Sequence, residues 1–157
     1  MRSILSFSEW NDVINRLYEI EYDWFGVDNL GQIAIFSSIG KGYIPTKAPS
    51  SYDKYIGLDD LMYYLPDITG AVVVMKEKRD NSYWEKQSTK GLFAYDYFDF
   101  LRKQKLEQYD LVSIPVTPLR FDSIPDIDSY IEIIPRFNLI FQNDISFRDL
   151  EQAEIMS

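Results

Sequence analysis

Carboxylates are the main side chains of this chain that could do acid–base chemistry, because the sequence contains no histidine and no cysteine. Without these residues there is no thiol nucleophile, no histidine-assisted serine or cysteine site, and no imidazole zinc site. Carboxylate acid–base chemistry, lysine chemistry and an oxygen-ligated magnesium or calcium ion remain open. Any catalytic role would therefore rest chiefly on aspartates and glutamates.

Two groups of aspartates could supply a catalytic carboxylate pair. Asp96 and Asp99 flank an aromatic pair, and Asp122, Asp126 and Asp128 gather near a proline. Either group could be imagined as an acid–base pair of the glycosidase type. Neither has a diagnostic spacing, however, and an acidic domain carries many carboxylates on its solvated surface. We therefore predict no catalytic residue, no metal ligand and no cofactor.

The stretch DWFGVDNLGQIAIFSSIGKGYIP contains four glycines and a lysine, which raises the question of a phosphate-binding loop. Gly26 and Gly31 have the glycine spacing of a P-loop, but Gln32-Ile33 stand where lysine and serine or threonine are needed. Gly40-Lys41-Gly42 has no dinucleotide fingerprint and no helix opening behind it. The pattern favours a β-hairpin over a phosphate site.

A tyrosine–tryptophan pair lies in the most polar part of the chain, Lys76 to Lys90. Tyrosine and tryptophan dominate the energetics of protein interfaces, so Tyr83 and Trp84 are predicted to be exposed binding anchors. The alternative is that the pair folds back over the core, since tryptophan is well buried on average. The sequence leaves both possibilities open.

Several helices and strands must position these residues. A capping box at Ser6 and Glu9, followed by apolar residues three and four apart, predicts an N-terminal amphipathic helix. Ser146 is expected to cap a C-terminal helix. We further expect helices over Leu58–Leu65 and Phe98–Leu106, and strands over Tyr22–Val27, Gln32–Ser37, Ala71–Lys76, Gly91–Tyr97, Tyr109–Val116 and Phe137–Phe141.

The sequence also predicts where two of these strands lie in the sheet and where two aspartates lie in a helix. The apolar run in Ala71–Lys76 is typical of a central strand, whereas prolines place Tyr109–Val116 at a sheet edge or a strand end. Asp59 and Asp60 are expected in the first turn of their helix, where negative charge suits the helix dipole. Pro125–Ile134 could form either a helix or a strand.

The sequence predicts a single acidic α+β domain over residues 1–157. It should contain a mostly antiparallel sheet of about five or six strands, an N-terminal amphipathic helix and two or three further helices. A chain of 157 residues with 46% hydrophobic residues suits one domain.

The longest apolar run, Ala71–Met75, is far shorter than the roughly 20 residues of a membrane span, and the N-terminus lacks a signal-peptide core. We therefore expect a cytoplasmic protein.

The charge of the chain restricts its partners. It carries 25 acidic and 16 basic residues, for a formal net charge of −9. This balance opposes binding to nucleic acid, whose phosphates are held mainly by lysine and arginine. It suits a basic partner, because complementary potentials speed encounter, although the charge could equally serve solubility alone.

The order of several segments resembles the small immunity proteins encoded beside secreted polymorphic toxins in bacteria. The segments that carry the likeness are Trp24–Phe36, Gly40–Pro45, Gly91–Asp96 and Tyr109–Leu119. The resemblance implies a cytoplasmic, non-catalytic protein that binds a cognate toxin domain and blocks its active site or substrate path.

A carboxylate-rich face would suit such a role, because toxin domains that act on nucleic acid are often basic. The residues predicted to contact the partner are aromatic and acidic residues expected at the surface: Tyr83, Trp84, Asp96 and Asp99. A regulatory or scaffold domain and a carboxylate-dependent, metal-assisted enzyme are the alternative functions.

Overall fold

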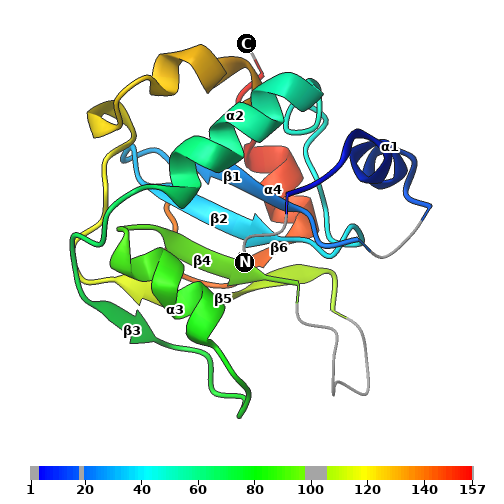
Figure 1. Cartoon of the computed structure of the whole chain (residues 1–157). Coiled ribbons are helices and arrows are strands. Elements are labelled where there is room, and N and C mark those ends of the chain that lie inside the picture. Colours follow the sequence, from blue (N-terminus) through cyan, green and yellow to red (C-terminus); the bar gives the residue numbers. More distant parts are fainter. Residues whose placement is uncertain (1–3, 18–19, 98–105, 157) are drawn as a thin grey trace.

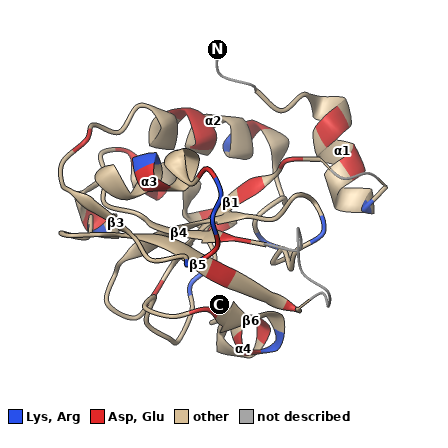
Figure 2. Cartoon of the chain, turned by 90° about the horizontal axis from the view of Figure 1, so that it is seen from below, with Lys and Arg blue, Asp and Glu red and all other residues tan. Residues whose placement is uncertain are grey.

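A mixed β-sheet forms the centre of the protein, with α2 and α3 on one face and α4 on the other (Figures 1 and 2). The computed structural model describes residues 4–17, 20–97 and 106–156. The helices are α1 (Phe7–Asn15), α2 (Tyr52–Tyr63), α3 (Ser82–Thr89) and α4 (Phe147–Ala153), with 3-10 segments η1 (Phe121–Ser123) and η2 (Ile127–Ile133). The strands are β1 (Asp23–Val27), β2 (Ile33–Ser37), β3 (Ala71–Val73), β4 (Phe93–Asp96), β5 (Gln108–Pro115) and β6 (Ile145–Ser146).

The strands lie in the order β1-β2-β4-β5-β3, and β6 pairs with the start of β5. Strands β2 and β4 are parallel, and every other named pair is antiparallel. A parallel pair needs a crossover connection, and here the chain between β2 and β4 contains α2, β3 and α3. This crossover places both helices on the same face of the sheet. The predicted α+β class and mostly antiparallel sheet are confirmed.

The glycine-rich stretch forms the predicted hairpin of β1 and β2. The buried carboxylate of Asp28 accepts hydrogen bonds from two backbone N–H groups of the turn, at 3.0 and 2.8 Å. Gly31 follows with a φ of +76°, a conformation that favours glycine. A Cβ atom on Gly26 would come within 2.7 Å of the Phe137 ring, so glycine is needed for close packing. These two glycines therefore have structural roles.

An aromatic row crosses three strands of the sheet. Trp24, Phe36 and Tyr95 are cross-strand neighbours on β1, β2 and β4, and all three are buried. The Trp24 and Phe36 ring centroids lie 4.1 Å apart, and those of Phe36 and Tyr95 lie 4.9 Å apart, in nearly parallel planes. Tyr109 and Phe141 meet the Phe36 ring edge-on. Because side chains alternate along a strand, the residues next to this row face α2 and α3.

Helix α1 begins with the predicted capping box. The Ser6 hydroxyl accepts a hydrogen bond from the Glu9 backbone N–H, and the Glu9 carboxylate accepts one from the Ser6 N–H, at 3.1 and 3.0 Å. Beyond the helix end, the Arg16 guanidinium donates to the backbone carbonyls of Gly40 and Gly42. The second glycine pair therefore belongs to a loop that α1 holds against the sheet.

Helix α2 begins earlier than the sequence predicted. Its N-cap is Ser51, whose hydroxyl accepts a hydrogen bond from the Lys54 N–H, so the helix contains twelve residues rather than starting near Leu58. Asp59 and Asp60 therefore lie in its C-terminal half, and their expected placement in the first turn is wrong. A local cap further upstream decided where the helix begins.

The lateral positions of two strands also differ from expectation. Strand β3 is short and lies at the sheet edge, where Val72 is 47% exposed, while β4 lies between β2 and β5. Strand β5 pairs with β3, β4 and β6, so it is not an edge strand, but it does end at Pro115 as one alternative held. Apolar content did not distinguish an edge from a centre, because lateral order depends on long-range pairing.

Four further segments predicted from the sequence have different outcomes. Ser146 caps α4 as predicted, accepting a hydrogen bond from the Asp149 N–H at 3.0 Å. Pro125–Ile134 contains the 3-10 segment η2, and Phe137–Phe141 forms no strand, because Phe137 makes only an isolated bridge. The helix expected over Phe98–Leu106 lies, apart from its last residue, outside the described residues. Within the described ranges, no helix is long and apolar enough to cross a membrane.

Replacing Phe36 by alanine should test the aromatic row. Phe36→Ala removes the central ring of the stack, so we expect the free energy of unfolding to fall by about 3–5 kcal/mol. Leu30→Ala, at a hairpin position that is 50% exposed, should change it by less than about 0.5 kcal/mol. Urea denaturation followed by tryptophan fluorescence measures both. Equal losses in the two variants would contradict the central role of the stack.

Candidate functional site

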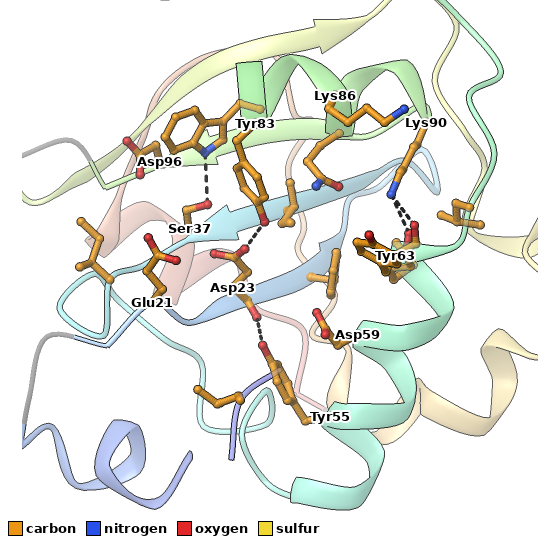
Figure 3. Close-up of a pocket in the computed structure, with 18 of the residues that line it drawn as sticks. Glu21, Asp23, Ser37, Tyr55, Asp59, Tyr63, Tyr83, Lys86, Lys90 and Asp96 are labelled. Carbon is orange, nitrogen blue, oxygen red and sulfur yellow. Dashed lines mark hydrogen bonds between the residues drawn. The ribbon is translucent and has the colours of Figure 1, made fainter. Parts of the chain in front are cut away.

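A groove of about 1320 Å³ lies between α2 and α3, over the sheet face opposite the aromatic row (Figure 3). Phe25, Ile35 and Met62 contribute buried apolar surface to its lining. Carboxylates outnumber basic residues among the lining side chains by six to three. The acidic residues are Glu9, Glu21, Asp23, Asp59, Asp67 and Asp96, and the basic ones are Arg79, Lys86 and Lys90.

All three basic residues of the groove are bonded to groups of the chain itself. Lys86 pairs with Asp67 at 2.6 Å, and Arg79 pairs with Asp96 at 2.7 Å. The buried Lys90 donates to two backbone carbonyls at the C-terminal end of α2, where a positive charge complements the helix dipole. Their contacts fix α3 and the preceding loop against α2 and β4.

Asp23 lies at the start of β1 and points into the groove (Figure 3). Its carboxylate accepts a hydrogen bond from the Tyr83 hydroxyl and interacts with the Ser37 hydroxyl, and no lysine or arginine of the described chain pairs with it. Burial raises the pKa of Asp23 to about 6, the two hydroxyls oppose this rise, and the negative charges of Asp59 and Glu21 add to it. The groove therefore holds a desolvated carboxylate beside two further acidic groups.

Two aromatic residues of α3 form the opposite wall. Tyr83 remains 45% exposed, but its hydroxyl reaches Asp23, and burial raises the pKa of Tyr83 far enough to keep it a donor. The half-buried Trp84 donates from Nε1 to the Ser37 hydroxyl at 3.2 Å. The Arg79 guanidinium lies over the Trp84 ring, 4.3 Å from its centroid. These contacts join α3 to the β1–β2 hairpin.

The four residues predicted to bind a partner have different outcomes. Tyr83 and Trp84 both line the groove, and the expected exposure holds for Tyr83, whereas Trp84 packs against the core as the alternative held. Asp96 also lines the groove, but it is only 4% exposed, so its expected surface position is wrong. Its strand, β4, is central, and its carboxylate is occupied by Arg79. Asp99 lies outside the described residues, and partner binding by all four remains a prediction.

The second group of aspartates lies outside the groove. Asp122, Asp126 and Asp128 are exposed residues of the segment that contains η1 and η2, and Asp122 lies 3.5 Å from Arg120. In the part of the chain that the structure describes, no group of three or more acidic residues could hold a metal ion. The geometry does not favour the second group as a catalytic pair, and the pair of Asp96 and Asp99 is not tested, because Asp99 lies outside the described residues.

Sequence reasoning missed Asp23, Glu21 and Asp59 as groove residues. A signal for Asp23 was present, because it precedes Trp24 and must face the other side of the sheet. The strand register places Asp23 beside Ser37, and Ser37 beside Asp96, in one polar row. This row could not be recognised without the parallel pairing of β2 and β4, which no local pattern predicts.

Comparisons with known proteins add no assignment: no family model, curated protein or solved structure matches the chain. The groove and its charges are therefore the features from which a function can be inferred.

Asp23 should make stability depend on pH. Its pKa of about 6 exceeds the ordinary 3.8, so the folded protein holds this proton more tightly than the unfolded chain. The stabilisation is complete below about pH 4 and is lost as the pH rises through 6. Relative to Asp23→Asn, the wild type should lose on the order of 1–3 kcal/mol between pH 4 and 7. Urea midpoints across this range test the prediction, and a constant difference between the two proteins would contradict it.

The ion pair between Arg79 and Asp96 should support the fold. Its two side chains are 18% and 6% exposed, so Asp96→Asn leaves a poorly solvated guanidinium and should cost about 3 kcal/mol of stability. Glu132→Gln is the matched control, because its pair with Lys54 is much more exposed and should contribute less than about 1 kcal/mol. Thermal and urea denaturation measure both. A smaller loss in Asp96→Asn than in the control would overturn the structural role of this pair.

Proposed function

We propose that this protein is a non-catalytic, cytoplasmic inhibitor of the immunity type, which binds a cognate bacterial toxin domain and covers its active site or substrate path. The observation that carries the proposal is the groove, where carboxylates outnumber cations and every cation is bonded within the chain. The formal net charge of −9 has the same sign. Together they support binding to a basic protein surface.

The physical basis of inhibition is charge complementarity. A toxin domain that acts on nucleic acid needs cations to hold phosphate, and a carboxylate-rich surface can occupy the same cations. Tyr83 and Trp84 stand beside the carboxylates, and tyrosine and tryptophan are the residues that interfaces favour as anchors. In this proposal Asp23 and Tyr83 contact the toxin, and Asp96 positions Arg79 and Trp84 beside them.

The resemblance to immunity proteins supports the proposal through the segments that build the groove. The segment Trp24–Phe36 contributes most of the β1–β2 hairpin, and Gly91–Asp96 contains β4. Both supply groove residues, such as Phe25, Ile35 and Asp96. These residues are the natural starting point for mapping a toxin interface.

An enzyme that depends on carboxylates is the second candidate, and Asp23 is the observation that favours it. A carboxyl group with a pKa of about 6 inside a groove is suited to general acid–base catalysis near neutral pH. Turnover of a substrate by the purified chain, with or without divalent metal, and its loss in Asp23→Asn would establish that function. A regulatory or scaffold domain would instead bind a partner without neutralising any toxin.

Co-expression with the protein encoded by the neighbouring reading frame tests the inhibitor proposal. We expect that neighbour to arrest growth when expressed alone, and the chain to restore growth and form a one-to-one complex. Raising the salt concentration from about 50 to 500 mM should weaken the complex at least tenfold, because screening reduces electrostatic attraction. Growth curves and titration calorimetry measure these effects.

The control is Glu151→Gln, an exposed position on α4, which lies on the other face of the sheet (Figure 2). It changes the net charge by one unit without touching the groove, so protection should persist. A harmless neighbour, or a toxic one that the chain neither binds nor neutralises, would refute the proposal.

A further inference from the structure

We propose that β3 is a self-association edge, at which two copies of this chain pair their β3 strands antiparallel across a twofold axis. The sheets of the two copies then continue into one another. The proposal goes beyond the inhibitor function and does not depend on it, because it uses the backbone of the sheet edge rather than the groove.

The first argument is the direction of the backbone groups of β3. Gly70 and Val74, which flank the strand, hydrogen-bond to the backbone of β5 and of the residue after it, at 2.9 and 2.8 Å. Because alternate residues of an antiparallel strand face the same neighbour, the N–H and C=O groups of Ala71 and Val73 point away from β5. Within the described residues β3 ends the strand order, so no strand receives these groups (Figure 1).

The opposite edge of the sheet, β1, is covered by the chain itself. The Val27 N–H donates to the Pro135 carbonyl at 3.0 Å, and the Val27 carbonyl accepts from the Phe137 N–H at 2.9 Å. The Asp23 carbonyl accepts a hydrogen bond from the Tyr55 hydroxyl at 3.0 Å. Several outward groups of β1 are thus paired within the fold, whereas those of β3 are left for water or a second chain.

The second argument is the apolar surface at the β3 edge. The run Ala71–Val74 contains no charged residue and no proline, which natural edge strands use against pairing with other chains. The three valines Val72–Val74 are 36–47% exposed, and Val116, which follows β5, is 65% exposed. A strand edge with outward backbone groups and exposed valines is a template for adding another strand.

A second copy of β3 matches this edge by symmetry. When Ala71 of one copy lies opposite Val73 of the other, every outward N–H group of the two strands meets an outward carbonyl. Val72 then lies opposite its own counterpart, at the kind of position where cross-strand side chains are closest. The hydrogen-bonding pattern of β3 is therefore complementary to itself.

Helix α3 leaves both faces of β3 accessible. Ser113 lies opposite Val73, and its hydroxyl donates to the Trp84 carbonyl at 2.8 Å, so α3 is bonded to β5. Side chains alternate along a strand, so Val73 faces the side of α3 and Val72 faces the other side. Both valines are partly exposed, so each face of the paired strands contributes apolar contacts.

The charges at the two ends of β3 favour the antiparallel orientation. Asp67 comes before the strand, and Lys76 and Lys78, with Glu77 between them, come after it. An antiparallel pair brings the basic end of each copy toward the acidic end of the other, whereas a parallel pair joins like ends. Asp67 also pairs with Lys86, so this effect orients the strands more than it strengthens the dimer. Salt at physiological strength screens the repulsion between two copies of charge −9 beyond about 8–10 Å.

The test measures the mass of the full-length chain by sedimentation velocity, from about 5 to 500 μM at about 150 mM salt, because a contact of this size is expected to be weak. We expect the 18.5 kDa monomer to convert to a dimer as the concentration rises. Amide exchange followed by NMR locates the contact. The N–H groups of Ala71 and Val73 should exchange several-fold more slowly in the dimer, because pairing protects them.

Variants of Val72 test the symmetry. Val72→Lys and Val72→Glu each place two like charges opposite one another, so each variant alone should dimerise at least about tenfold more weakly. An equimolar mixture of the two should dimerise again, because opposite charges then meet. Leu30→Lys and Leu30→Glu are matched controls, since Leu30 is 50% exposed in the β1–β2 turn, and they should dimerise like the wild type.

Val73→Pro tests the backbone contact separately. Proline removes the outward N–H of this position but no hydrogen bond to β5, and edge strands tolerate it there. Thermal unfolding confirms that the variant is folded, and its dimer should also be at least about tenfold weaker, because lost backbone pairing is not replaced.

Three results would overturn the inference: a wild type that stays monomeric throughout, a dimer that the Val72 and Val73 variants leave intact, or a mixture of the two Val72 variants that stays monomeric. Protection of Ala71 and Val73 only after another protein is added would overturn it too, because the edge would then serve a different partner. A dimer in a chain that neither binds nor neutralises its neighbour would contradict the inhibitor function alone.

Discussion

The stack of Trp24, Phe36 and Tyr95 is the constraint on which the rest of the structure depends. These rings lie side by side on three strands and fill one face of the sheet. Since the side-chain period of a strand is two residues, this register also decides what faces the other side. The adjoining row there begins with Asp23 and Ser37, at the floor of the groove. A slip by one residue would exchange the two rows, so the apolar core and the polar groove are specified together.

The polar row has a second function, because it holds the crossover helix in place. The hydroxyl of Tyr83 binds Asp23, the indole of Trp84 binds Ser37, and the loop before α3 supplies the guanidinium that pairs with Asp96. Each member of the row thus receives a donor from the same part of the chain. Among the residues that the structure describes, a cation reaches only the Asp96 position of this row, which separates a structural ion pair from a carboxylate bonded to neutral hydroxyls. The same helix therefore both completes the fold and forms one wall of the groove.

The sequence predicted the elements that depend on neighbouring residues. The capping hydroxyls of Ser6 and Ser146 each bind a backbone N–H three residues away, so their helices could be read locally. The polar sequence of α3 has little apolar periodicity, and no helix was expected there. Asp96 was expected at the surface because its exposure depends on which strands lie beside β4, which is a long-range property. Asp23 escaped notice for the same reason, since only the assembled register brings it opposite α3.

Charge acts at two distances in this protein, and the two effects have different consequences for binding. A formal charge of −9 would attract a basic partner from afar, but salt screens such attraction beyond about 8–10 Å. It therefore affects mainly the rate of encounter. Asp23 is partly shielded from solvent, so its interaction with a cation would be screened less and would act mainly on how slowly a complex dissociates. A protein of this charge could attract many basic surfaces, so any selection among them would depend on the shape and the short-range contacts of the groove.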